Sequence, residues 1–384
     1  MLHDVIIVGA GPVGASLALG LADADLDVAL VDARPAHAIA RGDRSLALSH
    51  GARLIFERLG VWGNLGVRSG AVTPIVEIDI SQAGGFGQVR LHARDHDLPA
   101  LGYVASYRAL QQALDAAVAR TRTAVRYDYN VTLAGGMRTY AAVTAANGGE
   151  PLLGRLVVVA DGGGACVTGI ERQRFDYRQV ALIAKIACRR PHRGVAYERF
   201  TSDGPVALLP EQDHYGLVWT GSPESVSALL ATAEDDFIAR LRSRFGPRRD
   251  DFVNVSDRRS FPLALEIAPS VVATRTVVIG NAAQALHPIA GQGFNVGLRD
   301  AFELSRVLLD TPRERIGTRD MLDRYARARR IDRIAGVAFT QGLLSVFGTD
   351  SRWLRWPRGL ALSLLDATPA AKRTFTRAVL FGLR

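Results

Sequence analysis

The beginning of the chain constrains its fold more than any other stretch. Residues 4–9 form an apolar run, Gly9-Ala10-Gly11-Pro12-Val13-Gly14 has the spacing G-x-G-x-x-G, and a second apolar run over residues 28–31 ends at Asp32. In a strand–turn–helix–strand unit the helix start faces a dinucleotide pyrophosphate, and the acid after the second strand accepts hydrogen bonds from the adenosine ribose. This order of strand, glycine-rich turn, helix and acid predicts a dinucleotide-binding α/β fold, but it does not distinguish a nicotinamide from a flavin dinucleotide.

A second glycine-rich stretch lies near residue 280. A β-branched run over residues 276–279 leads to Gly280-Asn281, then to His287-Pro288 and Gly291-Gln292-Gly293, and the apolar spacing of one helix face begins at Phe294. We expect a strand, a loop and a helix whose first N–H groups point at a bound anionic ring. An ordinary strand-to-helix turn is the alternative, but a connecting turn does not need this many glycines.

A third segment completes the expected sheet. The apolar residues 156–159 precede Asp161-Gly162, which predicts a parallel strand with an acid and a flexible turn at its carboxyl end. Because a long interval separates this strand from the N-terminal unit, the nucleotide-binding domain is expected to be discontinuous, over residues 1–70, 100–179 and 262–330.

The intervening residues have a different pattern. Short alternating strands in residues 71–99 and 180–261 predict an inserted, mostly antiparallel β-sheet that binds the substrate. One of these strands is expected over residues 75–80. A helix over residues 107–120 returns the chain to the nucleotide domain, and residues 331–384 are expected to form a C-terminal helical region.

Composition excludes several classes of protein. The chain has 384 residues and 48% hydrophobic content, so it can bury a large core and is not a disordered protein. Its only cysteines are Cys166 and Cys188, and neither they nor the histidines have metal-ligand spacing, so we expect no metal site and no disulfide scaffold. This predicts a reducing, cytoplasmic location.

The positive charge is concentrated at the C-terminal end. The formal net charge is +9, and residues 301–384 contain 16 Lys and Arg against 8 Asp and Glu. Such a region can contact anionic lipid headgroups at the inner membrane face or an acidic protein partner, and we expect no nucleic-acid partner. A solvated helical surface is an equally good interpretation.

Taken together, these segments resemble the single-component FAD-dependent aromatic hydroxylases. Further matches over residues 42–48, Tyr197-Glu198-Arg199-Phe200, residues 204–210 and Val218-Trp219 make the chain most similar to the ubiquinone-biosynthesis hydroxylases that act on 2-polyprenyl-6-methoxyphenol. The resemblance covers about residues 4–330. It implies a flavin domain with an inserted substrate sheet, and a place in a ubiquinone-biosynthesis protein assembly.

The resemblance also implies roles for individual residues. Gly11 and Gly14 would approach the pyrophosphate and Asp32 the ribose, whereas Arg108 is placed only by the helix that it opens. Asn281 stands where most of the family has an acid, which removes a negative charge near the ribityl chain. The full cofactor-binding set is Gly9, Gly11, Gly14, Asp32, Arg44, Arg108, Asp161, Gly162, Asn281, Gly291, Gln292, Gly293, Phe294 and Asn295.

The chemistry implied by the resemblance needs few catalytic side chains. NAD(P)H binds transiently and reduces FAD, dioxygen adds to give a C4a-hydroperoxide, and the phenol ring of the substrate attacks its distal oxygen. The catalytic candidates are the carbonyl of Pro288 and, as a general base for the phenol, His287. A histidine that only packs the loop is the favoured alternative for His287.

Two other functions stay open at the level of sequence. A hydroxylase of a small soluble aromatic acid would need a positive clamp, for which Arg178, Lys185 and Arg199 are candidates. A polyprenyl phenol instead needs an apolar channel with access from a membrane surface. The third possibility is a non-catalytic FAD-binding subunit of a biosynthetic assembly.

Overall fold

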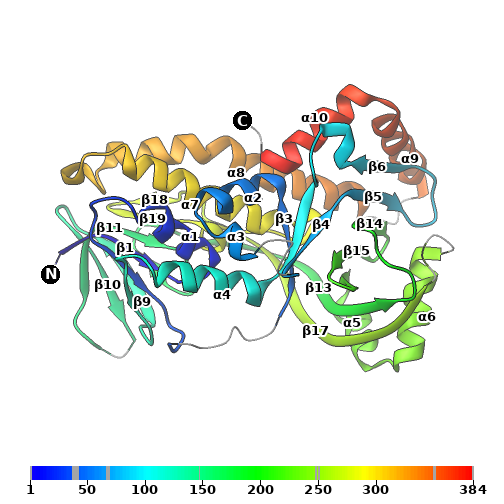
Figure 1. Ribbon diagram of the computed structural model, residues 1–384, viewed down its shortest axis with the longest axis horizontal. Coiled ribbons are helices and arrows are strands. Elements are labelled where there is room, and N and C mark those ends of the chain that lie inside the picture. The colour runs from blue at the N-terminus through cyan, green and yellow to red at the C-terminus, as the bar shows by residue number, and fades with distance from the viewer. Residues whose placement is uncertain are drawn as a thin grey trace.

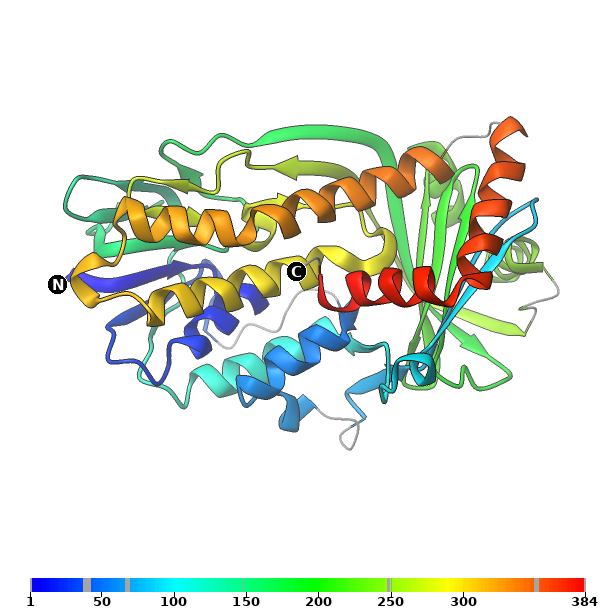
Figure 2. The ribbon, with the colours of Figure 1, turned by 90° about the horizontal axis from the view of Figure 1, so that it is seen from above.

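The computed structural model describes residues 2–36, 43–65, 70–146, 148–246, 249, 251–348 and 352–382. Figure 1 shows an elongated molecule with one sheet at each end, and Figure 2 shows helix α8 (Arg319–Phe347) running along the long axis across both ends. The two sheets correspond to the predicted nucleotide domain and the predicted insertion.

The first sheet is built around the strand that opens the chain. β1 (Leu2–Val8) pairs in parallel with β2 (Val28–Val31) and with β11 (Leu152–Val159), and β11 pairs in parallel with β19 (Thr276–Val278). Val5, Ile6 and Ile7 are fully buried, because both faces of such a sheet are covered. The remaining strands of this sheet are β8 (Ala124–Arg126), β9 (Val131–Gly136), β10 (Ala141–Ala145), β12 (Cys166–Val167) and β18 (Val272–Ala273).

Three helices pack together beside this sheet. α1 (Pro12–Gly20) contacts both α4 (Tyr107–Val118) and α7 (Gln292–Leu309), which come from distant parts of the sequence. The expected helix over residues 107–120 is confirmed by α4. α2 (His50–Arg58) contacts α7, and α3 (Trp62–Leu65) contacts α4.

The second sheet has eight strands within the described residues and is almost entirely antiparallel. Only β14 (Val195–Thr201) and β5 (Glu77–Gln82) pair in parallel. The other strands are β20 (Gln284–Ala285), β17 (Phe252–Ile267), β13 (Gln173–Cys188), β16 (His214–Gly221), β15 (Gly204–Glu211) and β6 (Gln88–His92). Helices α5 (Pro223–Ala231) and α6 (Glu234–Phe245) pack on it, around a core that includes Trp219 and Phe237. The fold class is therefore confirmed.

A small third sheet connects the two large ones. β3 (Ser45–Ser49), β7 (Gly102–Ser106) and β4 (Val72–Ile75) are antiparallel. The single strand expected over residues 75–80 is wrong, because Val76 donates its N–H to Gly194 and accepts from Ala93 instead of joining either sheet. The chain changes sheets at this residue, between β4 and β5.

The elements cross the predicted domain limits. β13 begins before residue 180, β17 ends after residue 261, and α8 continues through residue 330. The division into domains stays a prediction. The remaining elements are α9 (Arg352–Ala367), α10 (Pro369–Phe381) and the short 3₁₀ turns η2 (Ala93–His96), η4 (Gly280–Ala282), η5 (Ile289–Gly291) and η6 (Arg313–Arg315).

Candidate active site

The glycines of the first loop bring β1, β11 and α1 close together. Gly9 has φ +99°, and a Cβ there would lie 2.7 Å from the Asp161 Cα. A Cβ on Gly14 would lie 1.9 Å from the Gly9 carbonyl oxygen, so Gly14 lets α1 pack onto the loop. Gly11 is different, because a Cβ there would meet no atom within 4 Å. Gly11 borders open space at the uncapped start of α1.

The acids at the ends of β2 and β11 are held by backbone groups. Asp32 accepts hydrogen bonds from the N–H groups of Ala10, at 2.5 Å, and Arg34, at 2.8 Å. Asp161 accepts from Gly163 at 2.8 Å and Ala165 at 2.6 Å. Both carboxylates are therefore fixed in orientation before any ligand binds.

The second glycine-rich loop is anchored by a buried ion pair. The Gly280 N–H donates to Asp300 at 3.2 Å, and Asp300 pairs with Arg329 of α8 at 2.7 Å. These two side chains are 0% and 1% exposed. Asp332 lies 2.7 Å from Arg329 and favours its charged form, and together the two acids raise the pKa of Arg329 despite its burial. The loop position thus depends on charges inside the protein.

The turn before α7 has a left-handed backbone. Ala290 has φ 56° and Gly291 has φ 60°, and no side chain caps the first turn of α7. Gly293 and Phe294 follow in that turn. The helix therefore directs unpaired N–H groups and partial positive charge outward, which suits an anionic edge of a bound ring.

All of these loops border one cavity of about 1640 Å³. Gly11 from the first loop and Gly293 from the second both line it, although nearly three-quarters of the chain separates them. The other expected cofactor positions that line it are Gly9, Asp32, Arg44, Asp161, Gly162, Asn281, Gly291 and Phe294, together with the catalytic candidate Pro288. The open space at Gly11 and the two uncapped helix starts fit a cofactor that carries a pyrophosphate and an anionic ring.

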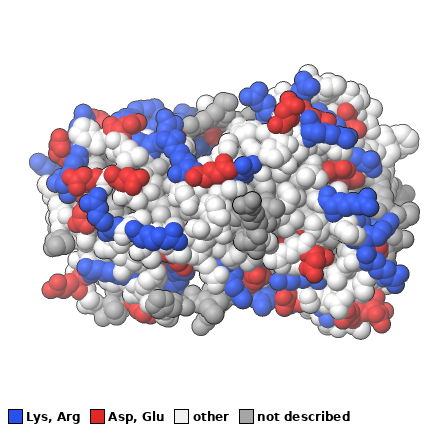
Figure 3. Space-filling view, viewed as in Figure 1, with Lys and Arg blue, Asp and Glu red and all other residues white. Residues whose placement is uncertain are grey.

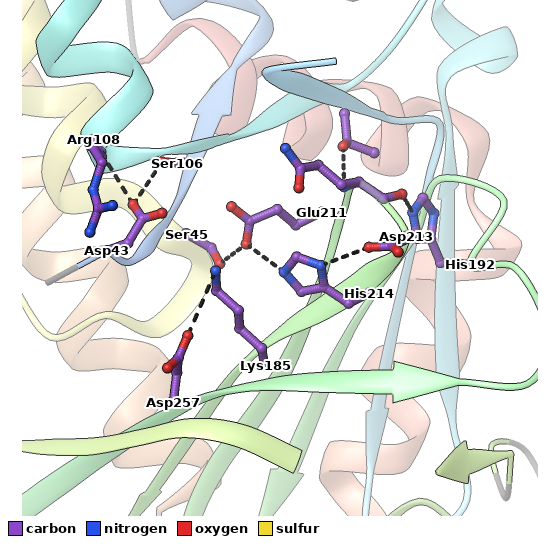
Figure 4. Close-up of polar contacts among 12 residues, drawn as sticks. Asp43, Ser45, Ser106, Arg108, Lys185, His192, Glu211, Asp213, His214 and Asp257 are labelled. Atoms are coloured by element: carbon purple, nitrogen blue, oxygen red, sulfur yellow. Dashed lines mark hydrogen bonds and ion pairs between the residues drawn. The ribbon is translucent and has the colours of Figure 1, made fainter. Parts of the chain in front are cut away.

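The far wall of the cavity belongs to the antiparallel sheet. Its apolar lining residues include Ile183, Leu209, Leu217, Val218, Phe261 and Leu263. Charged side chains are set among them, and Figure 4 shows Glu211 and Lys185 with their neighbours Ser45, His214 and Asp257. An aromatic ring with an apolar tail can contact this wall, while a polar ring substituent reaches the charged groups.

Comparison with known proteins decides the family. A family model described as an FAD binding domain matches residues 3–338. Ubiquinone hydroxylase UbiL of Rhodospirillum rubrum is 32% identical to this chain, with 99% of the chain and 90% of the relative covered. The 3-demethoxyubiquinol 3-hydroxylase of Escherichia coli is 29% identical, with 96% of each protein covered. The chain belongs to the FAD-dependent aromatic hydroxylases, in the group of the ubiquinone hydroxylases.

Solved structures agree on the fold. The p-nitrophenol 4-monooxygenase PnpA of Pseudomonas putida has a TM-score of 0.78 at 16% identity, with 100% of this chain and 99% of that chain covered. PqsL of Pseudomonas aeruginosa, solved with 2-aminobenzoylacetate, has a TM-score of 0.79 at 19% identity, with 94% and 100% covered. In this FAD-dependent hydroxylase, FAD is the cofactor and NAD(P)H is the electron donor typical of the family.

Some expected site residues of this hydroxylase lie off the cavity. Asn295 accepts from the Ser49 N–H at 2.9 Å and donates to the Ala47 and Gly291 carbonyls, so that its amide joins α7 to β3. Gln292 is buried and donates to the Ala290 carbonyl. Both hold the loop in place, and a contact with the cofactor stays a prediction for each of them.

The two arginine candidates also differ in position. Arg44 is on the cavity wall, with its guanidinium 5.1 Å from the ring centre of Tyr107. Arg108 is exposed and does not line the cavity, and its backbone N–H donates to Asp43 at 3.2 Å. Gly42, which belongs to the matched stretch before Arg44, lies outside the described residues.

His287 has the geometry of a packing residue. It is 1% exposed, its Nδ1 accepts from the Ile289 N–H at 3.2 Å, and its ring lies edge-on to Tyr177. Burial lowers its pKa to about 4, so the ring is neutral at pH 7. Since it does not line the cavity, these facts favour the packing alternative over a general base.

The structure places further residues at the loops and at the cavity that sequence reasoning missed. Asp300 and Arg329 hold the second loop, and Ser45 and Glu211 meet at the cavity wall formed by the antiparallel sheet. Charged residues within helices usually lie on the surface, so nothing in the residue pattern indicates that Arg329 is buried. The contact between Ser45 and Glu211 joins residues that are 166 positions apart, and no local spacing records it.

Proposed function

We propose that this hydroxylase adds oxygen to the aromatic ring of a polyprenylated phenol, of the 2-polyprenyl-6-methoxyphenol type, in ubiquinone biosynthesis. The observation that carries the proposal is the one cavity in which the proposed cofactor loops face a sheet surface with both apolar and charged residues. The substrate class follows the names of the relatives, ubiquinone hydroxylase and 3-demethoxyubiquinol 3-hydroxylase.

The protein's part in the reaction is to bind, orient and exclude water. FAD, when bound, supplies the redox chemistry between NAD(P)H and dioxygen. We assign the pyrophosphate to Gly11 and the start of α1, the ribose to Asp32, and the negatively charged ring edge to the N–H groups at Gly293 and Phe294. Pro288 lines the same cavity, and its carbonyl accepts the Gly291 N–H at 3.0 Å at the start of the loop that we assign to the ring.

Only one of the three clamp residues expected for a small aromatic acid lines this cavity. Of the three clamp candidates, Lys185 lines the cavity, with its ammonium 3.8 Å from the Asp257 carboxylate. Arg199 donates instead to the Arg244 carbonyl and to Ser81, and Arg178 does not line the cavity. The apolar wall favours a substrate with a hydrocarbon chain.

We further propose that α9 binds a membrane surface, where a polyprenyl phenol is stored. Trp353 is 90% exposed and Trp356 73%, and Leu360 and Leu364 continue the same face one and two turns later. Exposed tryptophan and leucine on one helix face are typical of helices that lie in the membrane interface. A second cavity of about 180 Å³ beside α9 is lined by Arg244, Arg355 and Arg358, which suits anionic headgroups.

The basic C-terminal charge supports this proposal only in part. Arg329, one of the arginines counted there, is buried in an ion pair. On the face drawn in Figure 3, Lys and Arg side chains are interspersed with Asp and Glu along the molecule. None of the described helices is long and apolar enough to cross a bilayer. Location at the inner membrane face, and assembly with other proteins of the pathway, stay predictions.

The function is tested with purified protein, FAD, NADH or NADPH, labelled dioxygen and a short-chain probe, 2-geranyl-6-methoxyphenol. We expect a product that has gained one labelled oxygen atom on the ring, detected by mass spectrometry. In parallel, 4-hydroxybenzoate serves as the small-acid probe. Labelled product from 4-hydroxybenzoate and none from the prenylated probe would reject the proposed substrate class.

A further inference from the structure

A polar cluster interrupts the apolar wall where β15 turns into β16. Glu211 is the last residue of β15, His214 is the first of β16, and the two form a cross-strand pair beside the turn. Ser45, the first residue of β3, reaches the same point from the neighbouring sheet (Figure 4). Glu211 is 5% exposed and lines the cavity.

The contacts of this cluster lead from the cavity to solvent. The Ser45 hydroxyl donates to the Glu211 Oε2. The same Oε2 lies 3.5 Å from the His214 Nε2, and the His214 Nδ1 lies 3.2 Å from the Asp213 carboxylate. The Asp213 side chain is 97% exposed. No described residue hydrogen-bonds the Glu211 Oε1, so this oxygen can meet a substrate hydroxyl.

Gly216 leaves room for the contact between Ser45 and Glu211, because it has no side chain. A Cβ on Gly216 of β16 would lie 2.1 Å from the Ser45 Oγ and 3.4 Å from the Glu211 Oε2. Any other residue at this position would push the serine and the carboxylate apart. The meeting of Ser45 and Glu211 therefore depends on a position in the sheet that has no side chain.

The cluster is close to the loop that we assign to the cofactor ring. Ser45 and Ala47 are two residues apart on β3, so their side chains share a face and are about 7 Å apart. A Cβ on Gly291 would lie 2.9 Å from the Ala47 Cβ, which places the loop directly against this strand. The cluster and the Gly291 loop therefore meet the same strand at positions two residues apart, and residues of both line the same cavity.

The charged groups around the cluster are of both signs. His214 faces Glu211 and Asp213, and contact with these acids raises the pKa of His214 above its usual value. Lys185 of β13 is paired across the sheet with Gly216, and its charge acts on His214 in the opposite direction. A neutral imidazole has one proton-accepting and one proton-donating nitrogen, and in His214 these two nitrogens face different carboxylates.

We propose that Glu211 is the catalytic base that removes the phenol proton during hydroxylation, and that His214 passes this proton to Asp213 and solvent. The proposal rests on the proposed function. The substrate O–H bond breaks, its electron pair stays on the phenolic oxygen, and the proton goes to the Glu211 carboxylate. His214 then accepts this proton at Nε2 and releases another from Nδ1, which restores the carboxylate. No oxidant or reductant takes part in these transfers.

The direction in which Glu211→Gln changes the reaction rate shows whether Glu211 acts as a base or only as a nearby negative charge. A carboxylate that only sat beside the phenol would disfavour the phenolate, so Glu211→Gln would speed the reaction. If Glu211 is the base, Glu211→Gln slows single-turnover hydroxylation of 2-geranyl-6-methoxyphenol by about 10²-fold at pH 7. Its rate then rises about tenfold per pH unit toward the phenol pKa near 10, while the wild-type rate is flat across neutral pH.

Two further variants complete the experiment. Asp257→Asn also removes a carboxylate from the cavity wall, and it is expected to keep the flat pH profile whatever its absolute rate. His214→Gln is expected to slow the reaction about tenfold, with partial rescue by added imidazole. FAD content and probe affinity are measured for each protein, so that a loss of binding is separated from a loss of proton transfer.

The possible results separate a failure of the proposed function from a failure of the proton relay. Wild-type protein that does not hydroxylate the probe contradicts the proposed function and the relay with it. Wild-type activity together with a flat pH profile in Glu211→Gln contradicts the relay alone. If Glu211→Gln fails to fold, an unchanged rate in His214→Gln overturns the route to solvent, and rescue by imidazole supports it.

Discussion

The two ends of the cavity are formed by different groups, with mainly backbone atoms at one end and side chains at the other. At the cofactor end, the parallel strands of the first sheet present backbone: glycines, N–H groups and two acids held by N–H groups. At the substrate end, the antiparallel strands present side chains, and Glu211, Lys185 and Leu209 come from different positions on two strands. A site made of backbone constrains which residues are tolerated, whereas a site made of side chains can change its chemistry without changing the fold.

The largest effect is expected for the ion pair that supports the cofactor end. Arg329→Met leaves Asp300 buried without its partner, which we expect to cost about 3–5 kcal/mol of unfolding free energy. The neighbouring Arg330→Met is the matched control, since Arg330 is exposed. Urea unfolding measures both. Equal stability of the two variants would show that the buried network does not support the second loop.

His287 should affect stability at acid pH but not catalysis. Its pKa is about 4 in the folded protein and about 6.5 when unfolded. The unfolded state therefore binds the proton more readily, and wild-type stability should fall as pH drops from 6.5 towards 4, by on the order of 3 kcal/mol. His287→Asn should remove that part of the pH dependence. A changed pH profile of hydroxylation above pH 7 would instead restore His287 as a general base.

Replacing Gly11 by a residue with a side chain should reduce FAD binding without preventing folding. Because a Cβ there meets no atom within 4 Å, Gly11→Val should fold normally but fill the space assigned to the pyrophosphate. We expect FAD content after purification to fall at least about tenfold, which corresponds to about 1.4 kcal/mol. Gly342→Val, at an exposed position of α8 with equally open space, is the control. Full visible absorbance in both proteins would remove Gly11 from the cofactor site.

The smallest effect is expected at the surface. Replacing Trp353 and Trp356 together by Ser should weaken binding to vesicles of phosphatidylglycerol several-fold, because the aromatic face of α9 is lost. Leu133→Ser, which removes an exposed apolar residue from β9, should leave vesicle binding unchanged. Sedimentation with vesicles measures both. Identical binding of the two variants and the wild type would argue against α9 as the membrane contact.

The difference between the two ends also explains what the sequence could predict. Residues 28–31 and helix 107–118 were predictable from apolar spacing, and Gly9 to Gly14 from a spacing that only backbone geometry requires. The break at Val76 was not predictable, because it depends on hydrogen bonds to Gly194 and Ala93, which are distant in the sequence. The contact between Glu211 and Ser45 was not predictable either, because it depends on how two sheets pack.

We propose that FAD and a phenol occupy one cavity, with the phenol between the Gly291 loop and Glu211. A crystal structure of the protein with FAD and 2-geranyl-6-methoxyphenol tests it most directly. We expect the FAD pyrophosphate at Gly11, the flavin ring at Gly293 and Phe294, and the phenol hydroxyl within hydrogen-bonding distance of the Glu211 carboxylate. A phenol bound outside this cavity, or a flavin ring away from Gly293, would contradict it.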